Sequence, residues 1–254
     1  MTYEKYASEI YYITKCAGEV IMDFYSGKVE VMIKGDESPV TPADLAANKY
    51  IVERLRELAP EIAIVSEENS DADNAKARDE GTFWLVDPLD GTKSYIKKTG
   101  EFTVNIALIE NGETTGGAIF VPVKNVGYFT AEDGNAYKQE KDGLPTQIRV
   151  RPTPECGLTV IASKSHRTDE TNDYINGLDK VHEIISASSS LKLCLLAEGG
   201  ADIYPRFGRT MEWDIAAGHA ILKAAGGTVE KIDGTKFVYG KEDLANPYFI
   251  AKAL

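Results

Sequence analysis

The sequence predicts a layered protein in which an α+β half is followed by an α/β half. Helical periodicity opens the chain, and paired apolar strands with tight turns follow between residues 102 and 130. From residue 158 onward, short apolar runs alternate with helical patterns, which is typical of helices packed against a sheet. At 254 residues the chain is long enough to bury a sizeable core, as one large domain or two small ones.

Two helices are predicted near the N-terminus. Apolar residues recur at helical spacing over residues 10–24, and the first helix should end near Gly27. The second helix should begin after Thr41, because threonine is a favoured N-cap and Pro42 suits the first helical position. Asp44 lies where an acid completes a capping box, and apolar residues continue the helix to about residue 58.

Two short buried strands should each end at acidic residues. The apolar run 62–65 is followed by Ser66, Glu67 and Glu68, and the run 83–86 is followed by Asp87. If these strands lie near each other in one sheet, their ends present acids to one crevice, where ligands of layered α/β proteins commonly bind. Residues 70–80 are polar and predict a loop.

An antiparallel meander should follow, with strands over residues 102–109, 114–121 and 126–130. Turn formers between residues 143 and 154 mark a candidate boundary. We therefore predict an N-terminal α+β domain over residues 1–151 and a C-terminal α/β domain over residues 152–254. The elements expected in the second domain are strands over 158–162, 182–185 and 202–205, strands around 229 and 249, and helices near 169–177, 190–198 and 212–225.

Composition narrows the possible partners. The formal net charge of −12 argues against nucleic acid and anionic membranes, because there is no basic surplus to neutralise phosphates. A small anionic ligand stays compatible if a local basic cluster or a bound metal holds it. The few, widely spaced cysteines predict a reducing, cytoplasmic location and no zinc site. There is no signal-peptide pattern and no apolar run long enough to span a membrane.

The segment Asp87-Pro88-Leu89-Asp90-Gly91-Thr92 has two interpretations of about equal weight when taken alone. It is compatible with an ordinary turn, because Asp, Pro and a later Gly are common turn residues. It is equally compatible with a metal site, because carboxylates at the end of a buried strand repel each other and need a compensating cation. Hard divalent ions such as Mg²⁺ prefer such oxygen ligands.

Further acids could converge on this segment, although each has an ordinary explanation. Paired glutamates such as Glu67 and Glu68 commonly lie in solvated loops. Asp214 opens an apolar helix, and Asp44 belongs to the predicted capping box, where acids are favoured by the helix dipole. Only their joint occurrence is specific.

Together the acids resemble a known family. Four blocks occur in its order and span about residues 39 to 222, and this pattern is similar to the inositol-monophosphatase superfamily of lithium-sensitive, Mg²⁺-dependent phosphomonoesterases. The resemblance implies a sandwich of alternating α/β/α/β/α layers. The blocks are Pro39-Val40-Thr41-Pro42-Ala43-Asp44, Ser66-Glu67-Glu68, Asp87-Pro88-Leu89-Asp90-Gly91-Thr92 and Trp213-Asp214-Ile215-Ala216-Ala217-Gly218.

A second set of segments resembles the 3'(2'),5'-bisphosphate nucleotidase branch of that superfamily. One departure is Ser188, which stands where the branch often has glycine before Ser-Ser-Leu-Lys. That glycine would aid close backbone approach to a ligand. The matching segments are residues 91–96, 100–107, 163–167, 189–192, 197–208 and 212–214.

The resemblance implies roles for the acids and for Thr92. Glu67, Asp87 and the Leu89 carbonyl would hold one Mg²⁺, and Asp87, Asp90 and Asp214 would hold a second. Glu67 would support a third, mostly hydrated ion. Thr92, oriented by Asp44, would position and deprotonate the attacking water. The first predicted domain would then carry most metal ligands, and the second the last ligand and the nucleotide-binding residues.

The resemblance also implies a set of substrate contacts. The N–H groups of Gly91 and Thr92 would cradle the reacting phosphate. Cationic side chains would receive the second phosphate, with Arg suited to bidentate contact and Lys acting as a point charge. The remaining substrate-binding candidates are Lys164, His166, Ser189, Ser190, Lys192 and Arg206.

The predicted function is Mg²⁺-dependent hydrolysis of the 3'-phosphate of adenosine 3',5'-bisphosphate to AMP and phosphate, with inhibition by Li⁺. One alternative is an inositol-1-phosphate or sugar-phosphate phosphatase with the same metal machinery. A less favoured alternative is a non-catalytic nucleotide- or metal-binding module, which loss of a metal acid or of Thr92 would indicate. The expected partner is a small phosphate monoester, and the expected state a monomer or homodimer.

Overall fold

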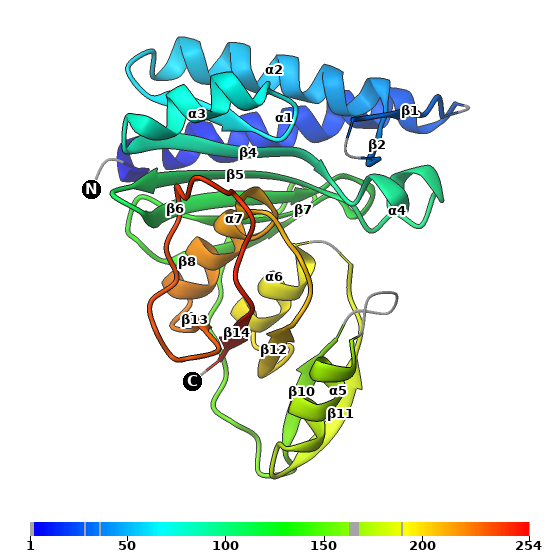
Figure 1. Ribbon diagram of the computed structural model, residues 1–254, viewed down its shortest axis with the longest axis vertical. Helices are drawn as coiled ribbons and strands as arrows, with labels where there is room; N and C mark the ends of the chain where they lie inside the picture. The colour runs from blue at the N-terminus through cyan, green and yellow to red at the C-terminus, as the bar shows by residue number, and fades with distance from the viewer. Residues whose placement is uncertain (1–2, 28, 36, 163–167, 189, 254) are drawn as a thin grey trace.

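The structure is a computed structural model, and it describes residues 3–27, 29–35, 37–162, 168–188 and 190–253. Two long helices, α1 (Ala7–Tyr25) and α2 (Pro42–Leu58), lie side by side over one face of a mostly antiparallel sheet (Figure 1). Tyr3–Tyr6 forms a 3₁₀ turn ahead of α1. Both helices agree with the sequence prediction.

The start of α2 follows from its sequence. The backbone N–H of Thr41 donates to Asp44 Oδ2 at 2.9 Å, so the predicted capping box is present. Pro42 occupies the first turn, where its missing N–H costs nothing. Between α1 and α2, the strands β1 (Met32–Ile33) and β2 (Pro39–Val40) pair as a small antiparallel ribbon.

Within the described residues, the first sheet has seven strands in the order β3-β4-β5-β6-β7-β8-β9. Only β3 and β4 pair in parallel, with Ser66 opposite Val86. The antiparallel meander from β5 to β7 is the one predicted. The strands are β3 (Ala63–Ser66), β4 (Thr82–Asp90), β5 (Thr103–Glu110), β6 (Glu113–Val121), β7 (Val126–Thr130), β8 (Ala136–Glu140) and β9 (Thr146–Gln147), with a 3₁₀ turn at Pro122–Lys124 before β7.

The Asp87–Thr92 segment is a strand end rather than a separate turn. Strand β4 continues to Asp90, and its pairing with β5 shifts register between Asp87 and Asp90. Such a bulge re-aims side chains at the edge of a ladder. Gly91 then adopts φ 95°, which glycine tolerates best, and begins the short helix α4 (Thr92–Ile96).

The predicted loop over residues 70–80 is wrong. Asp71–Asp79 forms α3, and the Ser70 side chain caps it by accepting a hydrogen bond from the Asp73 N–H at 3.2 Å. Its polar surface hid the helix, because only Asn74 and Ala77 are buried and no apolar stripe marks the helical period. The cap and the acids of the first turn were the available signal.

The second sheet has the order β11-β10-β12-β14-β13 among the described residues. Strand β10 pairs in parallel with β11 and β12, whereas β14 is antiparallel to both of its neighbours. These elements follow the predicted alternation of strand and helix. They are β10 (Leu158–Ile161), α5 (Asp169–Asn176), β11 (Val181–Ile185), α6 (Leu191–Ala197), β12 (Ile203–Arg206), α7 (Glu212–Ala224), β13 (Thr228–Lys231) and β14 (Phe249–Lys252).

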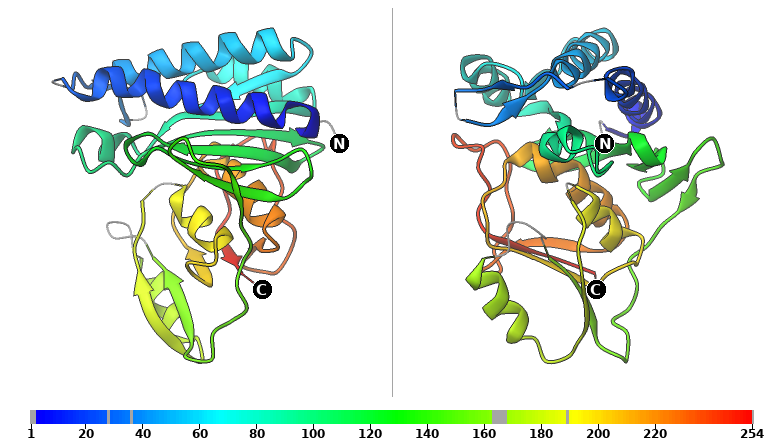
Figure 2. Two further views of the ribbon diagram at one scale, coloured as in Figure 1. Left: turned by 180° about the vertical axis from the view of Figure 1, so that it is seen from behind. Right: turned by 90° about the vertical axis from the view of Figure 1, so that its right-hand side faces the viewer.

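The described elements stack in the alternating layers that the resemblance implied. Helices α1 and α2 cover one face of the first sheet, and α6 and α7 lie between that sheet and the second (Figures 1 and 2). Helix α5 flanks the far side of the second sheet (Figure 2). The layered α/β fold class is therefore confirmed. Among the described helices, none combines the length and apolar character needed to cross a membrane.

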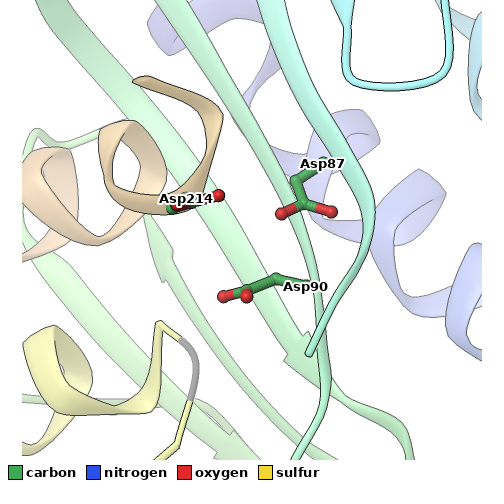
Figure 3. A group of neighbouring side chains, drawn as sticks. All are labelled: Asp87, Asp90 and Asp214. Carbon is green, nitrogen blue, oxygen red and sulfur yellow. The ribbon is translucent and has the colours of Figure 1, made fainter. Parts of the chain in front are cut away.

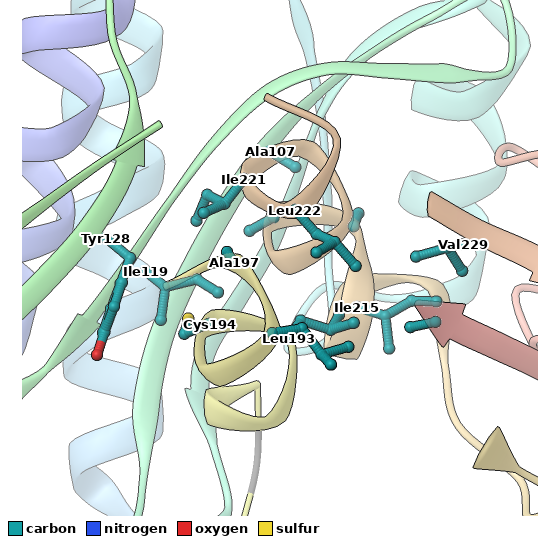
Figure 4. Packing of buried hydrophobic residues seen from close by; sticks show 14 of the residues in the cluster. Ala107, Ile119, Tyr128, Leu193, Cys194, Ala197, Ile215, Ile221, Leu222 and Val229 are labelled. Atoms are coloured by element: carbon teal, nitrogen blue, oxygen red, sulfur yellow. The ribbon is translucent and has the colours of Figure 1, made fainter. Parts of the chain in front are cut away.

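One large core cluster joins residues from both sides of the predicted domain boundary. Ile119 and Tyr128 of the first sheet pack with Leu193 of α6 and Ile221 of α7 (Figure 4). The helices between the sheets are thus anchored to the N-terminal half of the chain. The division into residues 1–151 and 152–254 stays a prediction.

Candidate active site

Three aspartates from two segments far apart in the chain point into one space. Asp87 and Asp90 come from the bulged end of β4, and Asp214 comes from the first turn of α7 (Figure 3). One carboxylate oxygen from each lies within 4.8 Å of the others. Asp214 is held in place because its Oδ2 accepts a hydrogen bond from the Met211 N–H at 2.8 Å.

Glu67 joins this group through the parallel pairing of β3 with β4. Its backbone N–H donates to the Val86 carbonyl at 3.2 Å, which aligns Glu67 with Asp87 at the ends of the two strands. The Lys34 ammonium lies 3.0 Å from the Glu67 carboxylate and 2.6 Å from that of Glu68. The two strands are thus paired, as the expectation of a shared crevice required, and Glu67 and Asp90 line one cavity.

The carboxylates are electrostatically strained. Burial raises the pKa of Asp87 well above its usual range, and the charges of Glu67 and Asp90 add to that rise. Burial, followed by the Asp90 charge, raises the pKa of Asp214 to about 8. Burial also raises the pKa of Glu67, although Lys34 opposes the rise. Clustered acids of this kind are typical of a site that a cation completes.

The donor set fits a hard divalent cation. Carboxylates are the preferred ligands of Mg²⁺ and Ca²⁺, and no histidine or cysteine belongs to the described cluster. Leu89 lies between the two aspartates of β4, and its carbonyl oxygen lies 3.3 Å from the Thr92 hydroxyl oxygen. Of the predicted metal ligands, Asp87, Asp90 and Asp214 are therefore grouped in the structure.

Asp44 and Thr92 form a second, adjoining pair. The Thr92 hydroxyl donates to Asp44 Oδ1 at 3.1 Å. The other oxygen, Oδ2, accepts from the hydroxyl of Thr41 at 2.5 Å and from its backbone N–H. Burial raises the pKa of Asp44, and these hydrogen bonds oppose that rise. The capping box thus fixes the carboxylate that Thr92 contacts.

An open cavity of about 780 Å³ surrounds this chemistry. Its walls include Glu67, Asp90 and Asp214 and the predicted substrate residues Gly91, Thr92, Ser190, Lys192 and Arg206. Lys164, His166 and Ser189 lie outside the described residues.

The Arg206 side chain is held by one hydrogen bond to a nearby carbonyl and has another N–H group without a hydrogen-bond partner among the described residues. Its Nη2 donates to the Arg209 carbonyl at 3.0 Å, whereas its buried Nε has no hydrogen-bond partner among the described residues. The Lys192 ammonium lies 5.4 Å from the centre of the Tyr204 ring. Both cations therefore line the same wall of the cavity from α6 and β12.

The structure adds residues that sequence reasoning did not assign. Lys34 reaches the acids from the β1–β2 ribbon, and the exposed Lys93 and Lys97 line the cavity from α4 and the loop after it. Glu101 accepts a hydrogen bond from the Ser188 hydroxyl at 2.6 Å. For Lys34 no signal was present in the sequence. The other three lie in or beside segments that carried the resemblance, but no role came with them.

Comparison with known proteins decides the family. A sequence model of the inositol monophosphatase family matches residues 3–252. The chain belongs to the inositol monophosphatase family. The family resemblance inferred from the four acid blocks is thereby confirmed.

Within that family the chain is similar to bacterial proteins named 3'(2'),5'-bisphosphate nucleotidase CysQ. It is 47% identical to the Salmonella typhimurium protein over 93% of this chain and 95% of the relative. It is 45% identical to the Escherichia coli K12 protein over the same shares. The crystal structure of CysQ from Bacteroides thetaiotaomicron, 40% identical, superposes with a TM-score of 0.84 over 99% of this chain and 98% of the other.

Proposed function

We propose that the protein is a 3'(2'),5'-bisphosphate nucleotidase. It hydrolyses the 3'-phosphate of adenosine 3',5'-bisphosphate and releases AMP and phosphate. The observation that carries this proposal is the 47% identity with the Salmonella nucleotidase along nearly the whole chain. The acid cluster and the cationic wall of the cavity supply the chemistry that such a reaction needs.

The acid cluster would hold Mg²⁺. Glu67, Asp87 and the Leu89 carbonyl form one candidate ligand set, and Asp87, Asp90 and Asp214 form the other, with Asp87 shared. Bound Mg²⁺ neutralises phosphate charge and lowers the pKa of the attacking water. The like charges that raise the pKa of Asp87 and Asp214 support this assignment, because a cation relieves that repulsion.

Thr92 and Asp44 would handle the proton of the attacking water. The Thr92 oxygen accepts a proton from water while its own proton passes to Asp44, along the 3.1 Å hydrogen bond between them. The water oxygen bonds to phosphorus as the ester P–O bond breaks. The 3'-oxygen leaves and takes up a proton from solvent. No covalent bond between enzyme and phosphate is needed.

The second phosphate would bind at the cationic wall. Arg206 offers a buried Nε that lacks a partner among the described residues, and Lys192 lines the same cavity. The N–H groups of Gly91 and Thr92 are the candidate cradle for the reacting phosphate. Roles for Lys164, His166 and Ser189 stay predictions.

Phosphate release with Mg²⁺ tests the proposal. The purified protein is assayed with adenosine 3',5'-bisphosphate, inositol 1-phosphate and fructose 1,6-bisphosphate at equal concentrations. We expect the highest kcat/KM with the nucleotide. Preference for either of the others would favour the inositol or sugar-phosphate alternative. Absence of release from all three would favour a non-catalytic binding module.

Lithium and ion number form a separate part of the proposal. We expect two or three Mg²⁺ ions per chain and inhibition by Li⁺ through competition for the acid cluster. Calorimetric titration of Mg²⁺ into the protein counts the sites, and phosphate release at rising LiCl, with KCl as the control, measures inhibition. Equal rates in the two salts would contradict the lithium proposal. A cytoplasmic location and a monomeric or homodimeric state belong to the same proposal.

A further inference from the structure

A buried chain of polar side chains leads from the first sheet to Asp90. The Thr103 hydroxyl donates to Asn105 Oδ1 at 3.0 Å, and Asn105 Nδ2 donates to Ser190 Oγ at 2.7 Å. Ser190 Oγ in turn donates to Asp90 Oδ2 at 2.7 Å. Thr103, Asn105 and Ser190 are each at most 3% exposed. Buried polar chains of this kind specify geometry, because each unmade hydrogen bond is costly.

The direction of these hydrogen bonds is set by chemistry. Asp90 Oδ2 and the Asp214 carbonyl oxygen are both acceptors for the single hydroxyl proton of Ser190, so that proton points away from Asn105. Asn105 therefore presents its amide donor to Ser190, and its carbonyl oxygen faces Thr103. The Ser190 backbone N–H also donates to Asp90 Oδ2, at 2.8 Å. Two donors on one oxygen hold the rotation of that carboxylate.

The Ser190 hydroxyl has three hydrogen-bonding neighbours inside the protein. Its hydroxyl oxygen also lies 2.9 Å from the Asp214 carbonyl, so it contacts both the β4 aspartate and the α7 turn that carries the third aspartate. The hydroxyl proton and one acceptor lone pair are therefore used inside the protein, and at 3% exposure Ser190 offers little surface to a ligand. The family resemblance implied a substrate contact for Ser190, and the hydrogen bonds favour a different role.

We propose that Ser190 is a positioning residue that orients Asp90 toward its cation, and that Asn105 fixes the direction of the Ser190 hydroxyl. This inference rests on the proposed function, which makes Asp90 a metal ligand. Ser190 also directly precedes α6, whose Lys192 lines the cavity. The same residue therefore joins the acid cluster to the wall proposed for the second phosphate. Partners of metal ligands commonly contribute 10- to 100-fold to metal affinity.

The test measures metal binding without substrate. Mn²⁺ is titrated into the full-length protein and followed by electron paramagnetic resonance, with Mg²⁺ as competitor. We expect Ser190→Ala and Asn105→Asp each to weaken Mn²⁺ binding by about 10- to 100-fold. Asn105→Asp keeps the shape but offers Ser190 an acceptor, so the serine proton turns away from Asp90. Ser188→Ala is the matched control, because its hydroxyl donates to Glu101 instead.

Kinetics separate positioning from substrate contact. At saturating Mg²⁺, Ser190→Ala should keep the KM for adenosine 3',5'-bisphosphate within about twofold while the Mg²⁺ concentration for half-maximal rate rises. Unchanged Mn²⁺ affinity with a raised KM would overturn the proposal and make Ser190 a substrate contact. Thermal unfolding shows whether each variant is folded. If Ser190→Ala does not fold, the Mn²⁺ affinity of Asn105→Asp tests the proposal in its place.

Failure of the proposed function gives a different pattern. The wild-type protein could bind Mn²⁺ without hydrolysing the nucleotide, while Ser190→Ala binds Mn²⁺ more weakly. That result would support the positioning role of Ser190 and contradict the proposed substrate. A wild-type protein that binds no Mn²⁺ would reject the positioning role itself.

Discussion

The charge of Asp90 raises the pKa of both other aspartates in the cluster. It contributes to the raised pKa of Asp87 and is the largest charge effect on Asp214. Asp90→Asn keeps the side-chain shape and an acceptor for Ser190, while it removes one ligand charge. We expect Mg²⁺-dependent phosphate release to fall by more than about 100-fold.

The same substitution should not unfold the protein. Without metal, loss of one like charge relieves repulsion, so the thermal midpoint should stay equal or rise. Asp23→Asn, an exposed acid on α1, is the control for the change in net charge and should leave activity unchanged. Near-full activity of Asp90→Asn would reject the assignment of Asp90 as a Mg²⁺ ligand.

Arg206 should decide between substrates with one phosphate and two. Arg206→Ala removes the guanidinium that lines the cavity, so kcat/KM for adenosine 3',5'-bisphosphate should fall about 10- to 100-fold, the size of a lost charged hydrogen bond. For adenosine 3'-monophosphate the loss should be within about threefold. Equal losses with both substrates would show that Arg206 serves the fold or the reacting phosphate instead.

At the level of single residues, the sequence predicted the acids of the site but not the residues that hold those acids in place. Glu67, Asp87 and Asp90 could be predicted because apolar strands end at them. The roles of Asn105 and Lys34 could not be predicted, because they depend on side-chain contacts with residues 85 and 33 positions away in the chain. Single polar residues in a strand or loop have many ordinary explanations.

Helix α7 carries an acid at its start and a partly buried titratable group in its middle. His219 packs against Phe237 and Tyr239, and its Nδ1 lies 2.8 Å from the Tyr239 hydroxyl. Burial lowers the pKa of His219 from 6.5 to about 3, with a smaller contribution from Lys223. The folded state therefore keeps this ring neutral where the unfolded state takes up a proton.

The stability that this histidine contributes should depend on pH. It is fully present above about pH 6.5 and is lost progressively as pH falls toward 3, because protonation then favours unfolding. His219→Gln removes the titration. Between pH 7.5 and 5, urea unfolding should show the wild type losing about 1–2 kcal/mol more than the variant. Parallel pH profiles would indicate that the ring is solvated or charged in the fold.

The seating of α7 on β6 should be sensitive to a single methyl group. A Cβ at Gly117 would lie 2.7 Å from the Ala217 Cα, which is backbone and cannot rotate away. Gly117→Ala should therefore destabilise the protein by about 1–3 kcal/mol and lower activity, since α7 carries Asp214. The control is Gly27→Ala, where nothing lies within 4 Å. A neutral Gly117→Ala would mean that α7 shifts without cost.

Elements with a hydrophobic period could be predicted, and those without one could not. Helices α1 and α7 bury a clear apolar face, whereas α3 is almost entirely polar. The bulge in β4 was also beyond reach, because bulges depend on the register with the neighbouring strand.

At the level of the whole molecule, the net negative charge of the protein repels its anionic substrate. The chain carries a formal net charge of −12, yet the cavity lining includes four cationic side chains: Lys93, Lys97, Lys192 and Arg206. A local positive wall in an acidic protein raises the encounter rate of anions, and salt screens that effect.

Removing the charges of Lys93 and Lys97 should show how much this attraction contributes to the encounter rate. The double variant Lys93→Gln/Lys97→Gln should lower kcat/KM for the bisphosphate about 3- to 10-fold at low ionic strength and flatten its salt dependence. Lys49→Gln/Lys76→Gln alters net charge equally but lies on α2 and α3, outside the cavity. If both doubles respond alike, overall charge rather than the rim governs encounter.

The layered architecture was accessible from the sequence mainly through the family resemblance. Periodicity alone predicted an α+β half and an α/β half, but it could not show that α6 and α7 pack on the first sheet. That packing depends on Ile119, Leu193 and Ile221, which are far apart in the chain.

The shared core between the sheets has a consequence for synthesis on the ribosome. Ile119 and Tyr128 belong to strands made early, and the helices that cover them contain Leu193 and Ile221. Until those helices emerge, one face of the nascent sheet is apolar and uncovered, a state prone to aggregation. Chaperone dependence should therefore be greatest for chains arrested after β9 and should fall once α7 has left the exit tunnel. Helix α7 also carries Asp214, the last of the three aspartates. The apolar face of the sheet is therefore covered at the same stage of synthesis at which the aspartate cluster becomes complete.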